Sequence, residues 1–335
     1  MPRVRYVMEV CASLDPGLPL AEVAPLVGRL EAIGVDAIHV PETVHDSLAV
    51  ALLAVSHTSS VTVRTAVTLA FVRSPTLVAY AAWDLRRLSQ GRFELGLGSQ
   101  IRQNVQDRYG MPWTEPTGRM RDYLSALHAL FAAFESGTLP PYEGETYRVT
   151  RLQPYFNPGP CSYGPPPVWL GAVNAGMCSV AGDLATGVIT HPTNSTPSHI
   201  ASVVRPALGG KRLLASATVA TGPTASAVAA ERERQRRQLA FLYSTPSYRP
   251  QLERQGWPEL QPQLAALTRS GGWERLAAVL TDEHLDALLL SGTFDDLPRL
   301  VLDRFEDLVD GVVLPAAALL LDESRAAQAV AALRL

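Results

Sequence analysis

The sequence predicts a single domain, residues 1–335, folded as a parallel (β/α)8 TIM barrel. Three observations support this fold class. Short apolar runs typical of buried strands alternate with amphipathic helical patterns along almost the whole chain. A chain of 335 residues with 47% hydrophobic residues can bury one large core. Two proline-rich stretches, 137–167 and 244–272, interrupt the alternation, and we expect them to be insertions after the fourth and seventh strands.

The first half of the chain contains four strand–helix units. Gly34 ends the first helical pattern, and Pro75 suits the first turn of the third helix. The stretch 61–69 is rich in β-branched residues, as expected of a strand. The predicted strands are 5–11, 35–40, 61–69 and 93–97, and the predicted helices are 20–33, 46–57, 74–88 and 115–134.

The second half repeats the alternation around the two insertions. Within the first insertion we expect a short hairpin at 143–149. The charge run 231–237 suits a solvated helix face and requires no partner. The predicted strands are 168–172, 187–190, 213–221 and 310–315, and the predicted helices are 174–185, 197–208, 224–243, 273–290, 294–308 and 322–333.

Composition excludes several classes of protein. A net charge of -3 with dispersed charged residues argues against a nucleic-acid-binding surface. Three scattered cysteines are too few for a disulfide framework and lack the spacing of a zinc site, so we expect no metal. No signal sequence or apolar run long enough to span a membrane is present. We therefore expect a soluble, cytoplasmic protein with a small-molecule or peptide ligand.

The residues that follow each strand are the candidates for chemistry, because parallel barrels carry their active sites at the carboxyl ends of the strands. Glu42 and His45 follow the second strand, and His191 follows the sixth. The fourth strand stops at Gly98 and continues into hydrogen-bonding side chains, which suits a bound ligand. The glycines at 96 and 98 lack the third glycine and the acidic partner of a dinucleotide-binding fingerprint, so we reject that interpretation.

Four stretches are similar to the bacterial luciferase-like superfamily and, within it, to oxidoreductases that use the deazaflavin coenzyme F420. They are 34–42 (GVDAIHVPE), 64–75 (RTAVT and RSP at its two ends), 88–98 (LSQGRFELGLG) and 166–172 (PPVWLGA). The third stretch is the most diagnostic, and the similarity covers nearly the whole chain. The resemblance implies a TIM barrel that binds the ring of a deazaflavin, or alternatively of FMN, over its mouth.

The resemblance also implies which residues bind the cofactor. A non-prolyl cis peptide, Ala66–Val67, would back the ring. The phosphate would lie at the start of the fifth helix, where free N–H groups and the positive helix end face one point. On local grounds alone, Asn174 would more often be only an N-cap. The implied cofactor-binding residues are Glu42, Thr43, Ala66, Val67, Gly98, Ser99, Asn104, Val173, Asn174, Ala175, Gly176 and Met177.

The resemblance places Glu42 near the ring as an acidic catalytic residue. Thr43 stands where related enzymes often carry histidine, and Ile101 stands where some carry glutamate. Oxidation of an alcohol requires a base at the hydroxyl, so it is less favoured unless His45 or His191 supplies that base. Either histidine could equally be a surface or packing residue.

These departures from the family pattern favour reduction. We expect hydride transfer from reduced F420 to an activated C=C or C=N bond, for example in a dehydroamino acid of a modified peptide. Tyr109 and Trp113 could wall the substrate pocket, or pack beneath the insertions. An FMN-dependent monooxygenase and a non-catalytic cofactor-binding protein would share the fold. By the same resemblance we expect a homodimer formed through the helices 46–57 and 75–88.

Overall fold

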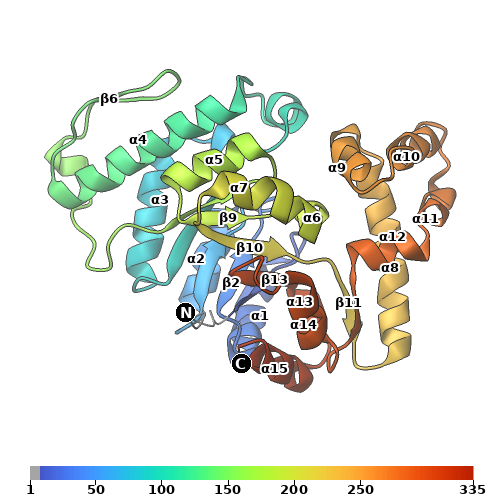
Figure 1. Cartoon of the computed structure of the whole chain (residues 1–335). Helices are drawn as coiled ribbons and strands as arrows, with labels where there is room; N and C mark the ends of the chain where they lie inside the picture. Colours follow the sequence, from blue (N-terminus) through green and yellow to red (C-terminus); the bar gives the residue numbers. More distant parts are fainter. Residues whose placement is uncertain (1–7, 335) are drawn as a thin grey trace, which may run out of the picture.

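The computed structural model describes residues 8–334, and its centre is a closed barrel of parallel strands (Figure 1). The barrel strands are β1 (Glu9–Ser13), β2 (Ala37–Val40), β3 (Thr62–Thr65), β5 (Phe93–Gly98), β8 (Val168–Gly171), β9 (Gly187–Ile189), β10 (Arg212–Ser216) and β13 (Gly311–Pro315). Each pairs in parallel with the next, β3 pairs with β5, and β13 returns to β1. The barrel has no open edge, which confirms the predicted (β/α)8 fold class.

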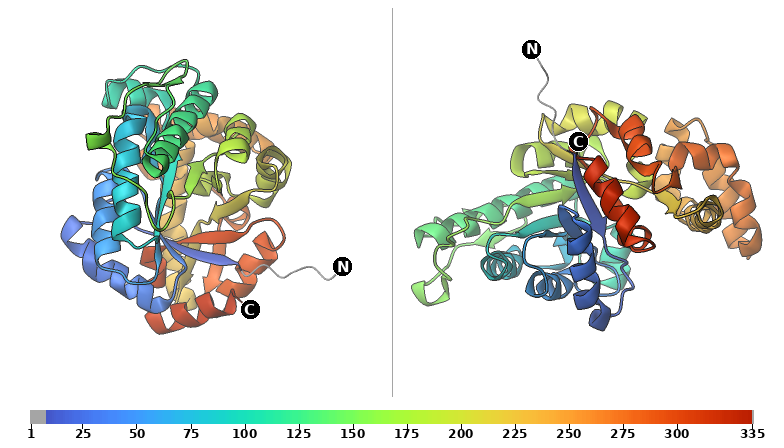
Figure 2. Two further views of the ribbon diagram at one scale, coloured as in Figure 1. Left: turned by 90° about the vertical axis from the view of Figure 1, so that its left-hand side faces the viewer. Right: turned by 90° about the horizontal axis from the view of Figure 1, so that it is seen from below.

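Helices surround the barrel on its outer side (Figure 2). Gly34 ends the first of them in the left-handed region, with φ of +89°, and prolines occupy the first turns of the third and fourth. The helices are α1 (Leu20–Ile33), α2 (Ser47–Ser56), α3 (Pro75–Leu88), α4 (Pro116–Ser136), α5 (Ala175–Leu184), α6 (Pro197–His199), α7 (Arg205–Leu208), α13 (Leu297–Phe305), α14 (Ala316–Leu319) and α15 (Glu323–Ala332). The predicted first strand, 5–11, lies partly outside the described residues, within which β1 begins at Glu9.

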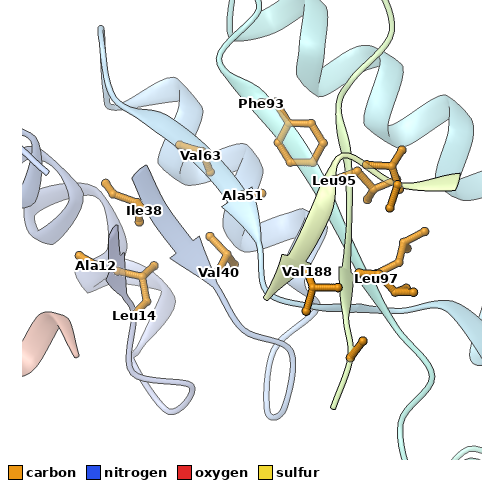
Figure 3. Packing of buried hydrophobic residues seen from close by; sticks show 14 of the residues in the cluster. Ala12, Leu14, Ile38, Val40, Ala51, Val63, Phe93, Leu95, Leu97 and Val188 are labelled. Carbon is orange, nitrogen blue, oxygen red and sulfur yellow. The ribbon is translucent and has the colours of Figure 1, made fainter. Parts of the chain in front are cut away.

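Outward-facing strand residues form the main hydrophobic core with these helices. Figure 3 shows Ile38, Val40 and Val63 beside Leu95 and Leu97, all of them fully buried. Because side chains alternate along a strand, the residues between them point into the barrel. The sequence therefore places apolar residues against the helices, and the alternate residues of each strand form the interior of the barrel.

Charged residues fill the barrel interior at the N-terminal ends of the strands. Arg64, almost fully buried, bonds Glu94 at 2.6 Å and Glu9 at 3.0 Å, and also donates to His39 Nε2 at 2.8 Å. Its guanidinium lies 4.3 Å from the centre of the Trp169 ring. We call the set Glu9, Arg64, Glu94, Trp169 and Arg212 the barrel-floor cluster.

Two predicted strands are interrupted. The stretch 61–69 forms β3, then a cis peptide at Ala66–Val67, and then the short β4 (Thr68–Leu69). The stretch 213–221 divides into β10 and β11 (Val219–Gly222), and β11 leaves the barrel to pair with β12 (Leu290–Thr293). The prediction of one continuous seventh strand was therefore wrong.

The first predicted insertion contains the expected hairpin. β6 (Tyr142–Glu143) and β7 (Arg148–Val149) pair in antiparallel fashion, followed by the 3-10 turn η3 (Pro154–Phe156). Asp122 on α4 accepts from the backbone N–H of Tyr147 at 3.0 Å and from the Tyr142 hydroxyl. A buried carboxylate thus attaches the hairpin to the barrel's helical layer.

The second predicted insertion is helical, and with its flanking helices it stands on one side of the barrel in Figure 1. Pro246 and Pro250 occupy first helical turns, where proline costs no hydrogen bond. Thr281 caps a new helix, so the predicted helix 273–290 is broken. We call 225–288 the helical lobe: α8 (Ala225–Tyr243), η6 (Pro246–Tyr248), α9 (Arg249–Arg254), α10 (Leu260–Arg269), η7 (Trp273–Arg275), α11 (Leu276–Val279) and α12 (Asp282–Leu288).

Candidate active site

The mouth of the barrel, at the carboxyl ends of its strands, is bordered by loops from several strands and by the helical lobe. The Ala66–Val67 peptide lies here and is cis, as predicted from the family resemblance. Val67 packs onto two glycines: a Cβ on Gly98 would lie 2.4 Å from Val67 Cγ2, and one on Gly171 would lie 3.0 Å from Val67 Cγ1. Ala66 and Val67 remain half-exposed. They present a small apolar surface at the mouth, and Gly98 is required by the Val67 side chain.

Glu42 is buried in an ion pair after β2. Its Oε1 accepts from Arg73 at 2.7 Å, and its Oε2 accepts from the Ser47 hydroxyl at 2.8 Å and the Leu69 backbone N–H at 3.3 Å. Arg73 also pairs with Asp46 at 2.8 Å. These bonds tie the loop after β2 to the segment after the cis peptide. The catalytic role of Glu42 stays a prediction, beside this clear role in holding the mouth together.

The other polar residues after β2 lie at the surface of the mouth. Thr43 is exposed, and its carbonyl accepts from Arg108 Nη2 at 2.5 Å. His45 is half-exposed and makes no hydrogen bond with a residue in the range 8–334. The structure therefore leaves His45 accessible and couples Thr43 to the loop after β5.

The loop after β5 carries the amides that the sequence suggested for cofactor binding. The Ser99 hydroxyl donates to the Gln100 carbonyl at 3.1 Å, and Gln100 adopts a left-handed φ of +61°. Asn104 begins a π-helical turn, Asn104–Arg108, and its side chain makes no hydrogen bond within the described chain. Ser99 and Asn104 are both half-exposed. Their polar groups remain available to a ligand.

The two aromatic residues predicted to wall the substrate pocket differ in environment. Trp113 packs edge-on against buried Phe71, with ring centres 5.9 Å apart, and belongs to the border of the main core. Tyr109 lies beside the Arg108 guanidinium, 5.2 Å from it. Of the two, Tyr109 is the less engaged in packing.

The start of α5 has the geometry expected of an anion site. Asn174 is the N-cap and accepts from the Met177 N–H at 2.9 Å, while Ala175 and Gly176 are exposed. A Cβ on Gly176 would lie 3.3 Å from the Thr117 hydroxyl, at the start of α4. His199 fixes the preceding strand end by a 2.7 Å bond to the Val173 carbonyl. The local N-cap and the implied phosphate site are therefore compatible, because the cap leaves the first N–H groups open.

His191, after β9, belongs to a polar network that the sequence did not reveal. Its Nδ1 lies 2.6 Å from the hydroxyl of buried Thr193, and that hydroxyl donates to buried Asn194 at 2.9 Å. Tyr248 of the helical lobe lies beside the imidazole, with ring centres 6.2 Å apart and ring planes tilted by 30°. Surrounding protein lowers the pKa of His191 to about 4, because burial disfavours the imidazolium, although the residue keeps an exposed surface.

The polar run from His191 to Thr196 was the only sequence signal for this network. Tyr248 follows far along the chain, so no local pattern could connect it with His191.

Taken together, these residues fit a flavin-type cofactor. Ala66 and Val67 offer an apolar surface for a flat ring. The start of α5, with Gly176 and Thr117, offers a cradle for a phosphate. A side chain larger than that of glycine at position 176 would fill this cradle.

Comparison with known proteins shows the family of the chain. The family model described as luciferase-like monooxygenase matches residues 7–313. The chain belongs to this family. A protein of Mycobacterium tuberculosis named only as uncharacterized is 37% identical over 313 residues, which cover 90% of this chain and 92% of that protein. A 5,10-methylenetetrahydromethanopterin reductase of Archaeoglobus fulgidus is 27% identical over 244 residues, covering 70% of this chain and 69% of the reductase.

Solved structures share the fold of this family member. The coenzyme F420-dependent tetrahydromethanopterin reductase of Methanopyrus kandleri superposes with a TM-score of 0.77 at 20% identity, covering 96% of this chain and 97% of that chain. The oxygenating component of a Pseudomonas putida diketocamphane monooxygenase, bound to FMN, superposes with a TM-score of 0.67 at 16% identity, covering 98% and 99%. By name both solved structures are oxidoreductases, one dependent on coenzyme F420 and the other bound to FMN.

Across residues 8–334, no helix is both long and apolar enough to cross a membrane.

Proposed function

We propose that this protein is an F420-dependent reductase that transfers hydride from the reduced deazaflavin to an activated double bond, preferably C=N. Support comes from the A. fulgidus relative, which is named as a reductase of a methylene-bearing pterin, and from the fit of the mouth to a flavin-type ring and phosphate. Reduced F420, when bound, supplies the hydride.

The observation that carries the choice of C=N is that Glu42 and His191, two of the three predicted catalytic residues, are poorly suited to donate a proton, which leaves His45 of the three. Glu42 already accepts three hydrogen bonds, including one from Arg73, and Ile101 stands in the loop after β5. With a pKa near 4, His191 is neutral at pH 7 and so is no imidazolium acid. Reduction of a C=C bond leaves a carbanion that must be protonated, whereas reduction of a cationic C=N bond gives a neutral amine directly.

The chain's own residues would position the reactants. Val67 and Ala66 would support the ring, and Gly176 with Thr117 would bind the phosphate. Ser99, Asn104 and Tyr109 would contact the remainder of the ligands from the loop after β5. Such positioning is the main contribution that a protein makes to hydride transfer.

The proposal is tested by cofactor titration followed by turnover. We expect the purified protein to bind F420 more tightly than FMN and to oxidise reduced F420 when 1-pyrroline is added, with slower reaction on a dehydroalanine peptide. Preference for FMN with oxygen-dependent product formation would instead establish a monooxygenase. Tight F420 binding without turnover of any activated C=N or C=C compound would establish a non-catalytic binding protein.

A further inference from the structure

A cavity of about 310 Å³ lies where the helical lobe joins the barrel. Its walls come from α12, the last helix of the lobe, from β12 and from α13 of the barrel. None of the predicted site residues lines it. This volume is at the lower end of the range found for ligand pockets, so the cavity suits a small molecule.

Arg304 on α13 is the charged side chain of this cavity that lacks a partner of opposite charge within the described chain. Its Nη2 donates to the Asp286 carbonyl at 3.0 Å, in the last turn of α12. Its Nε and Nη1 make no hydrogen bond with residues 8–334, and neither atom is sealed from solvent. Because a guanidinium has five N–H donors, most of those of Arg304 stay available to a ligand.

The two carboxylates of the cavity are already paired. Asp286 bonds Arg232 of α8 at 2.7 Å, and Asp303 bonds Arg299 at 3.2 Å. Both carboxylates are also largely exposed, at 70% and 64% of the side chain, so water solvates them. Burial lowers the pKa of Arg304, which the charge of Asp286 only partly opposes. The charge of the cavity that remains to be balanced is therefore positive.

The other walls of the cavity are apolar except for one hydroxyl. Leu289 and Leu290 are almost fully buried, and Leu300 packs against the main core. The Ser291 hydroxyl accepts from Arg232 at 3.0 Å, and its own proton makes no hydrogen bond with residues 8–334. A ligand that matches these walls carries an anionic group at one end and a short hydrocarbon chain at the other.

We propose that this cavity binds a small aliphatic carboxylate, with its carboxylate on Arg304 and Ser291 and its chain against Leu289 and Leu300. Guanidinium and carboxylate match in charge and in the geometry of their hydrogen bonds. The site is separate from the barrel mouth, and the inference does not rest on the proposed reductase function.

The position of the cavity gives such a ligand a place in the fold. It would contact both α12 of the lobe and α13 of the barrel, and so link the two. Arg304 also borders a second cavity of about 10 Å³, which Ser195 and Thr196 of the loop after β9 line. A carboxylate on Arg304 is therefore one side chain away from a loop of the mouth.

Isothermal titration calorimetry with hexanoate, at an ionic strength held constant with sodium chloride, tests the binding. We expect saturable binding with a Kd of about 1 mM, and about tenfold weaker binding of uncharged hexan-1-ol. Arg304→Met keeps an apolar stem but removes the guanidinium, and should weaken hexanoate binding about tenfold. Arg269→Met is the control, because Arg269 is an exposed residue of α10 that does not line the cavity. Its affinity should equal that of the wild type.

Two outcomes of the titration would overturn the inference: no saturable binding of hexanoate to the wild-type protein, or unchanged affinity in folded Arg304→Met. The place of binding is measured without any variant, by anomalous diffraction from crystals of the wild-type protein soaked with 6-bromohexanoate. We expect the bromine inside the cavity and the carboxylate within hydrogen-bond distance of Arg304. Bromine found only at the barrel mouth would refute the site. Neither measurement uses F420, so both are independent of the test of the proposed function.

Discussion

At the scale of single residues, Gly98 shows how a protein side chain, rather than a ligand, can require glycine. A Cβ at position 98 would lie 2.4 Å from Val67 Cγ2, which occupies the space that the glycine leaves. Position 98 thereby controls how far the Val67 side chain extends into the mouth. The family resemblance implied a cofactor-binding role for Gly98, which stays a prediction. The structure shows that the glycine shapes the surface that Val67 presents.

Gly98→Ala should displace Val67. We expect the free energy of unfolding to fall by about 1–3 kcal/mol, as for other overpacked sites, and F420 to bind more weakly. Denaturant unfolding and cofactor titration measure the two effects. Gly28→Ala, in the interior of α1 with nothing within 4 Å of the added atom, is the control and should raise stability by about 0.5–1 kcal/mol. Equal behaviour of the two variants would contradict this account of Gly98.

Glu31 gives the fold a defined pH dependence. Its carboxylate accepts from the N–H groups of Ser59, Ser60 and Val61 at 2.6–2.9 Å, just before β3. Although partial burial acts in the opposite direction, these bonds lower the pKa of Glu31 from 4.5 to about 2. Because the folded-state pKa is the lower one, the stabilisation is complete above about pH 4.5 and disappears as the pH falls towards 2.

We therefore expect Glu31→Gln to lower the free energy of unfolding by about 1.5 kcal/mol at pH 7, and by less than half as much near pH 3. Urea unfolding at both values is the measurement. Glu145→Gln, which changes an exposed carboxylate without a hydrogen-bond partner in the described chain, should have no effect at either pH. A loss at pH 7 that persists unchanged at pH 3 would show that the charge is not the cause.

At the scale of elements, the start of α5 combines a structural cap with a proposed phosphate site. Asn174→Asp separates the two roles, because aspartate caps a helix as well as asparagine does but adds a negative charge. Stability should be unchanged, and the dissociation constant for F420 should rise roughly tenfold through repulsion of the phosphate.

Cofactor titration and thermal unfolding of the same samples measure both quantities for Asn174→Asp. The control is Thr224→Asp at the cap of α8, outside the barrel mouth, which should leave cofactor affinity unaltered. Wild-type affinity in Asn174→Asp would place the phosphate elsewhere.

The elements also show how much of the fold could be predicted from the sequence. The barrel strands could be predicted because each is a short apolar run followed by a strong helical pattern. β11 could not be separated from β10, since both are apolar and the choice of partner depends on β12, far along the chain. In the lobe, Pro246 and Pro250 belong to the proline-rich stretch 244–272 that was predicted to be an insertion, and the structure places both in the first turns of short helices.

The candidate site also has features that could be predicted from the sequence and features that could not. The cis peptide and the α5 cap follow from local stretches that resemble the family. The Arg73 ion pair of Glu42 and the Tyr248 contact of His191 depend on which loops meet at the mouth, and this is decided by the tertiary fold.

At the scale of the whole molecule, apolar side chains are exposed on α2, α3 and η3. Leu52 on α2, Leu77 and Leu88 on α3, and Tyr155 and Phe156 in η3 are all exposed. The Tyr80 hydroxyl bonds the Phe156 carbonyl at 2.7 Å, which holds η3 against α3. Exposed apolar side chains on neighbouring elements suit a protein contact, and the homodimer through α2 and α3 stays a prediction.

Leu77→Glu should therefore convert a dimer into a monomer without changing the fold, because a charge would be buried at the contact. Light scattering after size-exclusion chromatography at several concentrations measures the mass, and circular dichroism checks the fold. Leu321→Glu, at an equally exposed site in a different part of the chain, should remain dimeric. A monomeric wild-type protein would contradict the prediction.

The barrel-floor cluster has a consequence for the order in which ligands bind and leave. Two carboxylates and two guanidinium groups pair with one another around Trp169 and close the N-terminal end of the barrel. The barrel is therefore open to ligands only at its mouth. A ligand that binds at the mouth must also leave through the mouth. If a deazaflavin lies on Val67, a substrate that binds later lies above it. The amine product must then leave before the oxidised cofactor can dissociate. Steady-state kinetics should then be ordered, with the cofactor first in and last out.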